Sequence, residues 1–404
     1  MLYRAYDARS MLVAPIFTVA AAQSKMLRAV APAGADLPYL RGWRATAETI
    51  SALKLSHERP AFGIDAVAVA GETVAVREEV ICSTPFGSLV RFAKPGIESQ
   101  PKVLVVPGLA GHFATLVRPT VRTMLSDHEV FVADWHNARD VPVSAGRFGL
   151  DEYVEHLIEF IAEIGPGTHV VAVCQPCPAV LAAAALMAED DHPAQPQSIT
   201  LMAGPVDARR NPGPVNRFAS KQSPESLERR VITTVPWPHR GAGRRVYPGF
   251  LQTLGFIGMD PRRHVSALGG MMRDYARGDN EAAQRTRTFY EEYFAVLDIT
   301  AEFYLETARS VFIDYDLPRG RMRWRGRHVD PSTIRTSLLT IEAEKDEMCP
   351  PGQTKAAHDL CTGIPAARKR HHSQPGVGHY GVFSGSRFDR EIYPQIRSFV
   401  ANAG

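Results

Sequence analysis

The sequence has almost no surplus of charge, few cysteines and no hydrophobic run of membrane-spanning length. Its 46 Lys and Arg residues are nearly balanced by 43 Asp and Glu residues, which leaves a net charge of +3. That balance excludes the whole-protein charge signature of nucleic-acid binding. The 5 cysteines are an odd number and are scattered, so we expect free thiols in a reducing compartment and no disulfide framework. The composition, 45% hydrophobic and 22% charged, excludes a disordered or fibrous chain.

The most apolar stretch covers residues 11–22 and follows Arg4 and Arg9. It is shorter than the roughly 20 residues that cross a bilayer, so we expect no integral membrane segment. Its Ala20–Ala21–Ala22 end is similar to the cleavage site of a weak signal peptide. We favour an amphipathic or buried N-terminal helix, and a helix that adheres to an apolar surface is a third interpretation.

Short, continuous apolar runs alternate with segments of helical spacing. The runs predict buried parallel strands at 103–106, 128–135, 169–173, 198–203 and 337–343. Helices are expected at 151–164, 178–188, 351–361 and 387–400, the first with Asp151 at its N-cap. This alternation predicts an α/β fold with a mostly parallel, doubly wound sheet.

The strand pattern stops between 205 and 330, a region rich in Pro, Arg, Tyr and Phe. We interpret this region as a mainly helical cap inserted between two parts of one sheet. Residues 1–100 then hold an N-terminal helix and leading strands, 101–204 the first part of the core, and 331–404 its second part.

Cys174 lies where the strand 169–173 meets the helix that starts near Pro178. This is the position of a nucleophile elbow, and free N–H groups at a helix start favour a thiolate. The neighbours two positions away are normally glycines and are here Ala172 and Pro176. Alanine is small, and a proline in the first helical turn costs little. Cys174 is therefore either a nucleophile or an inert buried thiol.

Cys177 forms a C-x-x-C pair with Cys174, which in other contexts is a redox pair or half of a zinc site. No second Cys/His pair has ligand spacing, so we expect no metal and place Cys177 in the core.

A nucleophilic cysteine needs a base and a group that orients the base. Asp346 follows the strand 337–343, and His379 lies further along between glycines, so the order nucleophile, acid, histidine is kept. Other acids and bases remain open at this stage: Glu344 and Asp134, and His358, His371 and His372. The last two follow a basic run and are expected in a solvated turn.

An oxyanion site is expected from the N–H that follows the nucleophile, Gln175, and from the glycine-containing loop 107–112. In that loop we favour the N–H of Leu109 or Ala110. His112 is a candidate substrate contact.

Arginines alternate from Arg319 to Arg327 around Trp324, and 209–245 is also Arg-rich. Such interleaving occurs in nucleic-acid binding, but flanking aspartates favour a solvated face paired with carboxylates.

Three motifs together resemble one family. They are Val173-Cys174-Gln175-Pro176, the segment 342–346 (EAEKD) followed by Gly352-Gln353-Thr354, and the segment 376–383 (GVGHYGVF). With them the chain resembles the intracellular polyhydroxybutyrate depolymerases over most of its length, including its first three residues, the loop 111–116 and the segment 174–188. The Cys-Gln-Pro elbow is specific, because most hydrolases have Gly-x-Ser-x-Gly. Cys177-Pro178 departs from the expected apolar residues.

The resemblance implies an α/β-hydrolase fold in which Cys174, Asp346 and His379 form a triad that cleaves amorphous poly(3-hydroxybutyrate). It implies a cytoplasmic enzyme on polyester granules that needs no cofactor, with water or coenzyme A as acyl acceptor. Aromatic residues of the insertion are expected either to line a polyester groove or to form a simple helical core. They are Trp237, Tyr247, Phe250, Phe289, Tyr290, Tyr293, Phe294 and Tyr304. We expect no nucleic-acid partner and leave self-association open.

Two alternatives remain. A polyhydroxyalkanoate synthase-like acyltransferase also uses Cys, Asp and His on this fold, although its usual Gly-x-Cys-x-Gly is absent. A catalytically silent granule protein is the other.

Overall fold

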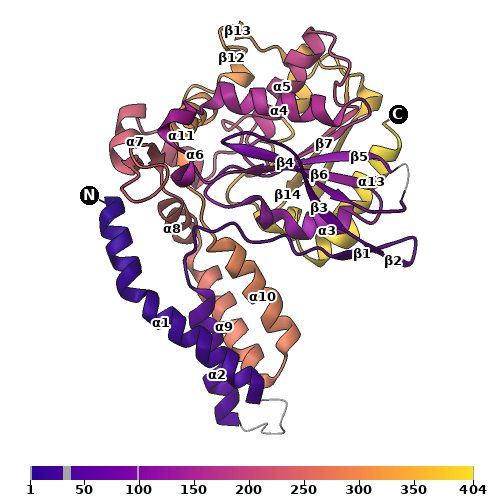
Figure 1. Cartoon of the computed structure of the whole chain (residues 1–404). Helices are drawn as coiled ribbons and strands as arrows, with labels where there is room; N and C mark the ends of the chain where they lie inside the picture. Colours follow the sequence, from indigo (N-terminus) through magenta and orange to yellow (C-terminus); the bar gives the residue numbers. More distant parts are fainter. Residues whose placement is uncertain (1, 31–37, 98–99, 404) are drawn as a thin grey trace.

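A central eight-stranded sheet organises the molecule, and helices cover both of its faces (Figure 1). The computed structural model describes residues 2–30, 38–97 and 100–403. The strands are β3 (Arg77–Ser83), β4 (Gly87–Ala93), β5 (Lys102–Val106), β6 (Glu129–Trp135), β7 (His169–Val173), β8 (Ser198–Met202), β14 (Ser337–Ala343) and β15 (Lys369–Gln374).

The strand order is β15-β14-β8-β7-β5-β6-β4-β3. Strand β4 pairs antiparallel with both β3 and β6, and the pairs from β6 to β15 are parallel. This topology confirms the predicted α/β-hydrolase fold with a mostly parallel sheet. The carboxyl ends of its parallel strands therefore meet at one edge, where sites on such sheets are built.

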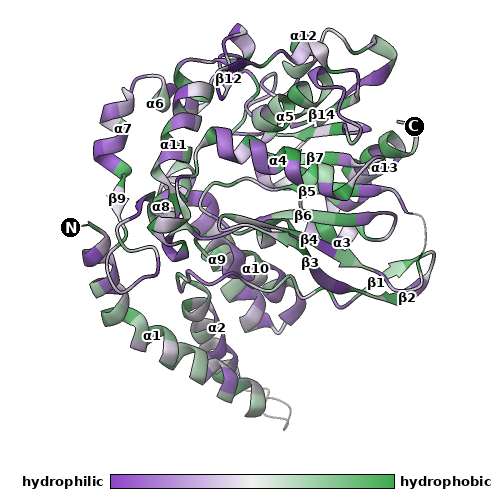
Figure 2. Cartoon of the chain, turned by 45° about the horizontal axis from the view of Figure 1, so that its top comes forward, coloured by the Kyte–Doolittle hydropathy of each residue, from purple (hydrophilic) through white to green (hydrophobic). Residues whose placement is uncertain are grey.

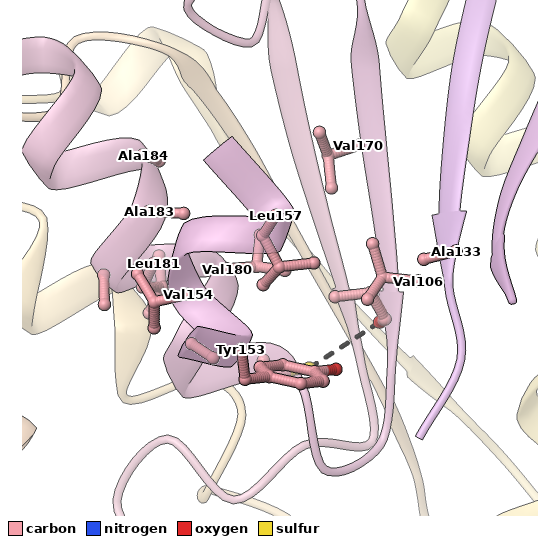
Figure 3. Close-up of a cluster of buried hydrophobic side chains, with 14 of the residues drawn as sticks. Val106, Ala133, Tyr153, Val154, Leu157, Val170, Val180, Leu181, Ala183 and Ala184 are labelled. Atoms are coloured by element: carbon pink, nitrogen blue, oxygen red, sulfur yellow. Dashed lines mark hydrogen bonds between the residues drawn. The ribbon is translucent and has the colours of Figure 1, made fainter. Parts of the chain in front are cut away.

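Two helices cover one face of the sheet, α4 (Leu150–Ile164) and α5 (Cys177–Glu189). Helix α5 carries small and aliphatic side chains on all sides and is almost entirely buried, because it lies between the sheet and further structure. Figure 3 shows this packing, with Val106, Ala133 and Val170 from the strands facing Tyr153, Leu157 and Val180 from the two helices.

The start of α4 corrects one prediction. Gly149, and not Asp151, is the N-cap residue, and its N–H donates to Glu152 Oε2 at 2.7 Å.

The opposite face of the sheet is covered by α3 (Arg118–Met124) and α13 (Tyr393–Ala401).

The segment between β8 and β14 contains the predicted insertion. Its helices are α6 (Pro214–Ala219), α7 (Pro224–Val231), α8 (Gly249–Met259), α9 (Pro261–Arg277), α10 (Asn280–Tyr293) and α11 (Ala301–Thr307). It also holds a small sheet of β9 (Thr233–Thr234), β10 (Arg245–Tyr247) and β11 (Ile299–Thr300), and a hairpin of β12 (Arg323–Trp324) and β13 (Arg327–His328).

Two of the alternating arginines of the hairpin are paired with carboxylates of the core helices. Arg325 contacts Glu155 at 2.6 Å, and Arg327 contacts Glu189 and Asp190, both at 2.6 Å. Their charges are thereby partly neutralised.

Helices α1 (Leu2–Val30) and α2 (Pro38–Ala52) pack against the insertion, beside α9 and α10, and form an arm below the sheet (Figure 1). Helix α1 is much longer than the apolar stretch 11–22. Its residues Leu2–Leu27 are long and apolar enough to cross a membrane, by length and composition only, and few of them are buried. We expected an amphipathic or buried helix, and of the two the burial is wrong, since Leu12, Ile16 and Val19 of α1 are exposed. Figure 2 shows hydrophobic residues along this helix.

The remaining strands, β1 (Ala66–Val69) and β2 (Glu72–Ala75), form a separate hairpin.

Two predictions near the C-terminus are corrected. The helix expected at 351–361 shrinks to α12 (Ala357–Leu360), because Glu342 Oε1 accepts the N–H groups of Gly352, Thr354 and Lys355, each at 2.9 Å, and holds an irregular loop. His371 and His372 lie in the edge strand β15, and not in a turn.

Candidate functional site

Cys174 lies at the carboxyl end of β7, in the turn that leads into α5. Its φ of 70° is in the left-handed region, a conformation that non-glycine residues adopt only where the surroundings enforce it. Here the Cys174 N–H donates to Met202 O on β8 at 2.8 Å, and the Cys177 N–H donates back to Cys174 O. The turn therefore projects a partly exposed thiol above the sheet edge, in the geometry of a nucleophile elbow.

Gly204, just beyond β8, explains how this elbow forms with Ala172 and Pro176 as its neighbours. A Cβ at Gly204 would lie 2.1 Å from Cys177 Sγ and 2.6 Å from Cys174 O. The close backbone approach that elbow glycines usually allow is thus provided by a glycine just past the end of the adjacent strand. This residue carries no motif of its own and was not predicted.

Cys177 is fully buried, and burial raises the pKa of its thiol. It packs in the core between α5 and the sheet, as predicted. No group of three or more His, Cys, Asp or Glu residues with metal-binding geometry occurs in the described parts of the chain.

Asp346 and His379 lie together beside Cys174. The His379 Nδ1–H donates to Asp346 Oδ2 at 2.8 Å, and both side chains are buried. The second oxygen, Oδ1, accepts the N–H groups of Met348 at 2.9 Å and Cys349 at 2.8 Å. These bonds fix the carboxylate, which in turn selects the tautomer and orientation of the imidazole.

The Cys174 side chain also contributes to the electrostatic environment of His379. Burial lowers the pKa of His379, but the charges of Asp346 and Cys174, with the hydrogen bond to Asp346, outweigh burial and raise that pKa well above its usual value. The imidazolium is favoured mainly because the Asp346 carboxylate stabilises it. The site therefore holds a thiol, an imidazole and a carboxylate that fixes the imidazole.

The alternative acids and bases lie elsewhere. Asp134 is paired with Arg59 at 2.5 Å, and Glu344 accepts the N–H of Gly376. His358 and His371 both hydrogen-bond with Thr340 Oγ1, while His372 bonds with the side chain of Gln374. Each of these side chains is therefore bonded to a neighbour other than Cys174.

Thr354 ties the loop of Asp346 to the end of β8. Its hydroxyl donates to Gly204 O and accepts the Gly204 N–H, both at 2.9 Å. Together with the three bonds to Glu342, this connection gives the Gly352-Gln353-Thr354 motif a positioning role for the acid loop.

The proposed oxyanion donors are close to the thiol but partly occupied. Leu109, Ala110 and Gln175 line the same cavity as Cys174. The Leu109 N–H donates to the side-chain oxygen of Gln175 at 3.1 Å. A carboxamide oxygen thus takes the place of a substrate oxygen at this donor, and a substrate has to displace it.

A cavity of about 670 Å³ opens beside Cys174. Its core side is formed by the residues just named with Met348 and Cys349, and its other walls come from α6, α7, α8, α11 and their neighbours. Apart from Tyr247 and Tyr304, the predicted groove residues do not line it. Trp237 is 84% exposed on a surface loop, and Phe250 is buried in a separate cluster, stacked on Tyr6 with ring centroids 3.8 Å apart.

His112 is buried behind the cavity. Its ring packs against Phe256 and Tyr293, and burial lowers its pKa to about 4. The position indicates a neutral packing residue and not a substrate contact. The sequence analysis missed the actual wall residues, such as Phe218, Phe303 and Thr307, because helical insertions carry no strand pattern that orients their side chains.

Known proteins resemble this chain at several levels. The poly(3-hydroxyalkanoate) polymerase subunit PhaC of Haloarcula marismortui is 21% identical over 292 residues, 70% of this chain and 56% of that protein. The chain therefore spans little more than half the length of this curated relative.

Among solved structures, an esterase of Thermogutta terrifontis is 14% identical with a TM-score of 0.44, over 80% of this chain and 98% of that one. A 2-hydroxy-6-oxo-6-phenylhexa-2,4-dienoate hydrolase from a Rhodococcus species is 12% identical with a TM-score of 0.43, over 81% and 99%.

The model of the family described as PHB de-polymerase C-terminus matches residues 203–404, half of the chain. This half contains Asp346, His379 and every helix of the insertion. The chain is thus a polyhydroxyalkanoate-related protein of the α/β-hydrolase fold, and it belongs to the PHB depolymerase C-terminus family.

Proposed function

We propose that this protein is an intracellular depolymerase that cleaves the ester bonds of amorphous poly(3-hydroxybutyrate) through Cys174, His379 and Asp346. The observation that carries the proposal is the juxtaposition of a strained, partly exposed Cys174 with the buried His379–Asp346 pair at the mouth of a largely apolar cavity. A nucleophile, a base and an orienting acid are the groups that acyl transfer needs.

In the proposed mechanism, the Cys174 thiolate attacks an ester carbonyl, and N–H groups of Gln175 and Leu109 or Ala110 stabilise the oxyanion. The tetrahedral intermediate collapses when the C–O bond breaks and the His379 imidazolium gives its proton to the leaving alkoxide. The product is an alcohol-ended chain and a thioester on Cys174.

The second half-reaction releases the acyl group. His379, now neutral, removes a proton from water or from the thiol of coenzyme A, and the nucleophile so formed attacks the thioester. Water gives 3-hydroxybutyrate or its oligomers, and coenzyme A gives the corresponding thioester. Cys174 returns to the thiolate and His379 to the imidazolium.

Incubation of the purified protein with amorphous polyhydroxybutyrate granules, with and without coenzyme A, tests the proposal. We expect soluble 3-hydroxybutyrate products, or coenzyme A esters where the thiol is present, from the wild type and none from Cys174→Ala. Equal product release from both proteins would overturn the assignment of the nucleophile.

The similarity to the archaeal polymerase subunit supports a second candidate, an acyltransferase of the polyhydroxyalkanoate synthase type. Incorporation of labelled 3-hydroxybutyryl-coenzyme A into polymer, with no release from granules, would favour it. Granule binding without turnover of either substrate would favour the silent granule protein.

We further propose that the enzyme works in the cytoplasm at the granule surface, with α1 as one contact. Exposed apolar residues follow one face of this helix, and charged residues precede and follow its apolar stretch. Such a helix suits the boundary between water and an apolar phase.

A further inference from the structure

Three hydroxyl groups stand out in the wall of the cavity beside Cys174. They belong to Tyr247, Tyr304 and Thr307, whereas most of the other wall residues are apolar, such as Phe218, Phe303 and Met259. Polar groups in an apolar pocket commonly fix the orientation of a ligand, so their placement points to recognition.

The three residues form one group. Tyr304 and Thr307 are three positions apart on α11 and therefore lie on the same side of the helix. Tyr247, on β10, packs against Tyr304 with ring centroids 4.3 Å apart. All three thus come from the insertion and not from the loops that hold Cys174.

These hydroxyls have no hydrogen-bond partner within the described residues. Thr307 is 7% exposed, and its Oγ1 is buried and unpaired. Buried polar groups are normally paired, so an unpaired hydroxyl on a residue that lines the cavity is available to a ligand bound there. Burial also raises the pKa of Tyr304 to about 12, so its O–H remains a donor at neutral pH.

A polyester segment matches this wall chemically. Its ester oxygens accept hydrogen bonds and donate none, and its methyl and methylene groups are apolar. A volume of about 670 Å³ lies within the range of roughly 300–1,000 Å³ of pockets that enclose ligands larger than one short acyl group. There is room for more than the acyl unit attached to Cys174.

We infer that Tyr247, Tyr304 and Thr307 form a subsite for a second ester carbonyl of the substrate chain, next to the ester that Cys174 attacks. The inference rests on the proposed function and adds to it a preference for substrates with at least two ester groups. The hydroxyls donate to this carbonyl, and the aromatic rings contact the methyl groups of the chain.

The test compares a linear trimer of 3-hydroxybutyrate with 4-nitrophenyl butyrate, an ester of one acyl unit. The measured quantity is the ratio of kcat/KM for the trimer to kcat/KM for the nitrophenyl ester. In Thr307→Val, which replaces the hydroxyl by a methyl group, we expect this ratio to fall about twofold to tenfold, the loss typical of one hydrogen bond to a ligand. Tyr304→Phe should lower it similarly, and Thr307→Ser should keep it near the wild-type value.

Matched controls are Thr46→Val, on an exposed part of α2, and Tyr315→Phe, whose ring contacts with arginines are kept. An unchanged ratio in Thr307→Val and Tyr304→Phe, or an equal loss on both substrates, would overturn the subsite alone. Cleavage of the nitrophenyl ester by the wild type without cleavage of trimer or polymer would overturn the proposed function, and the subsite with it.

Discussion

The imidazole of His379 experiences opposing influences from its burial and from its anionic neighbours. Burial favours the neutral ring, and the Asp346 carboxylate together with Cys174 favours the charged ring and prevails. The protonation of His379 therefore depends on Asp346, whose Oδ2 lies 2.8 Å from the imidazole Nδ1. Replacing the carboxylate of Asp346 by a carboxamide tests this dependence.

Asp346→Asn should lower the pKa of His379, because the negative charge is lost while burial remains. The carboxamide also fails to select the productive tautomer, so turnover should fall by about 10²–10⁴-fold. Titration of isotope-labelled histidine by NMR would measure the pKa, and ester hydrolysis would measure the rate. Asp134→Asn is the control, and a greater loss of activity there than in Asp346→Asn would refute the assignment of the acid.

Gln175 is the second residue whose chemistry is testable in isolation. Its side-chain oxygen accepts the Leu109 N–H at 3.1 Å, so it competes with the substrate oxygen for that donor. In Gln175→Glu, a carboxylate should hold the donor more tightly and repel an oxyanion. We expect kcat to fall about 10²–10³-fold, as for loss of one oxyanion donor.

Gln284→Glu, on the exposed side of α10, adds the same charge far from the cavity and controls for it. Activity in Gln175→Glu equal to that of this control would show that the Leu109 N–H takes no part in turnover.

At the residue scale, the sequence predicted best where backbone context and chemistry coincide. Cys174 and Asp346 each follow a recognisable strand, His379 lies in a glycine-flanked loop, and the structure brings the three together. Trp237 and Phe250 were chosen for aromatic character alone and lie outside the cavity. Side-chain direction within a helical insertion depends on tertiary packing, which composition does not reveal.

At the scale of elements, the attachment of α1 depends on a buried carboxylate. Asp298 accepts the Tyr3 O–H at 2.6 Å and the Gly249 N–H at 2.8 Å, so the start of α1 is joined to the start of α8, which lines the cavity. Burial raises the pKa of Asp298 to about 6, while the hydrogen bond from Tyr3 lowers it.

Tyr3→Phe should reduce the free energy of unfolding by about 1.5–3 kcal/mol at pH 8, the range for a hydrogen bond to a charged group. Loss of the Tyr3 hydrogen bond raises the pKa of Asp298 further in the folded state. The folded mutant then binds a proton more readily than the folded wild type, so the difference in stability should shrink as the pH falls from 8 towards about 6 and level off below that pH. Urea unfolding at pH 8 and pH 5 measures both values, and a loss independent of pH would contradict the role of Asp298.

The order of the elements was also largely predictable, because buried parallel strands are continuous apolar runs, as in β5 and β7. Strand β15 was missed, since its residues Lys369–Gln374 are polar and occupy a sheet edge where burial imposes no apolar pattern. The short α12 was overestimated, because three backbone N–H groups bind to Glu342 in place of helical carbonyls.

At the scale of the whole molecule, the arm of α1 and α2 follows from neither strand pattern nor motif. It forms because α2 packs on α9 and α10, far along the sequence, and α1 packs on α2. The packing uses one side of α1 and leaves Leu12, Ile16 and Val19 exposed at helical spacing. An apolar face of this kind favours association with an apolar surface.

Leu12→Glu combined with Ile16→Glu should therefore weaken retention on polyhydroxybutyrate granules by about tenfold or more, because two apolar side chains that would leave water are replaced by charges. Sedimentation of granules with bound and free protein measures the partition. Thr18→Glu combined with Ala21→Glu adds the same charge to exposed positions of α1 outside the apolar face and should retain binding. Equal retention of the two double variants would exclude this face of α1 as the granule contact and leave the insertion as the surface that binds polyester.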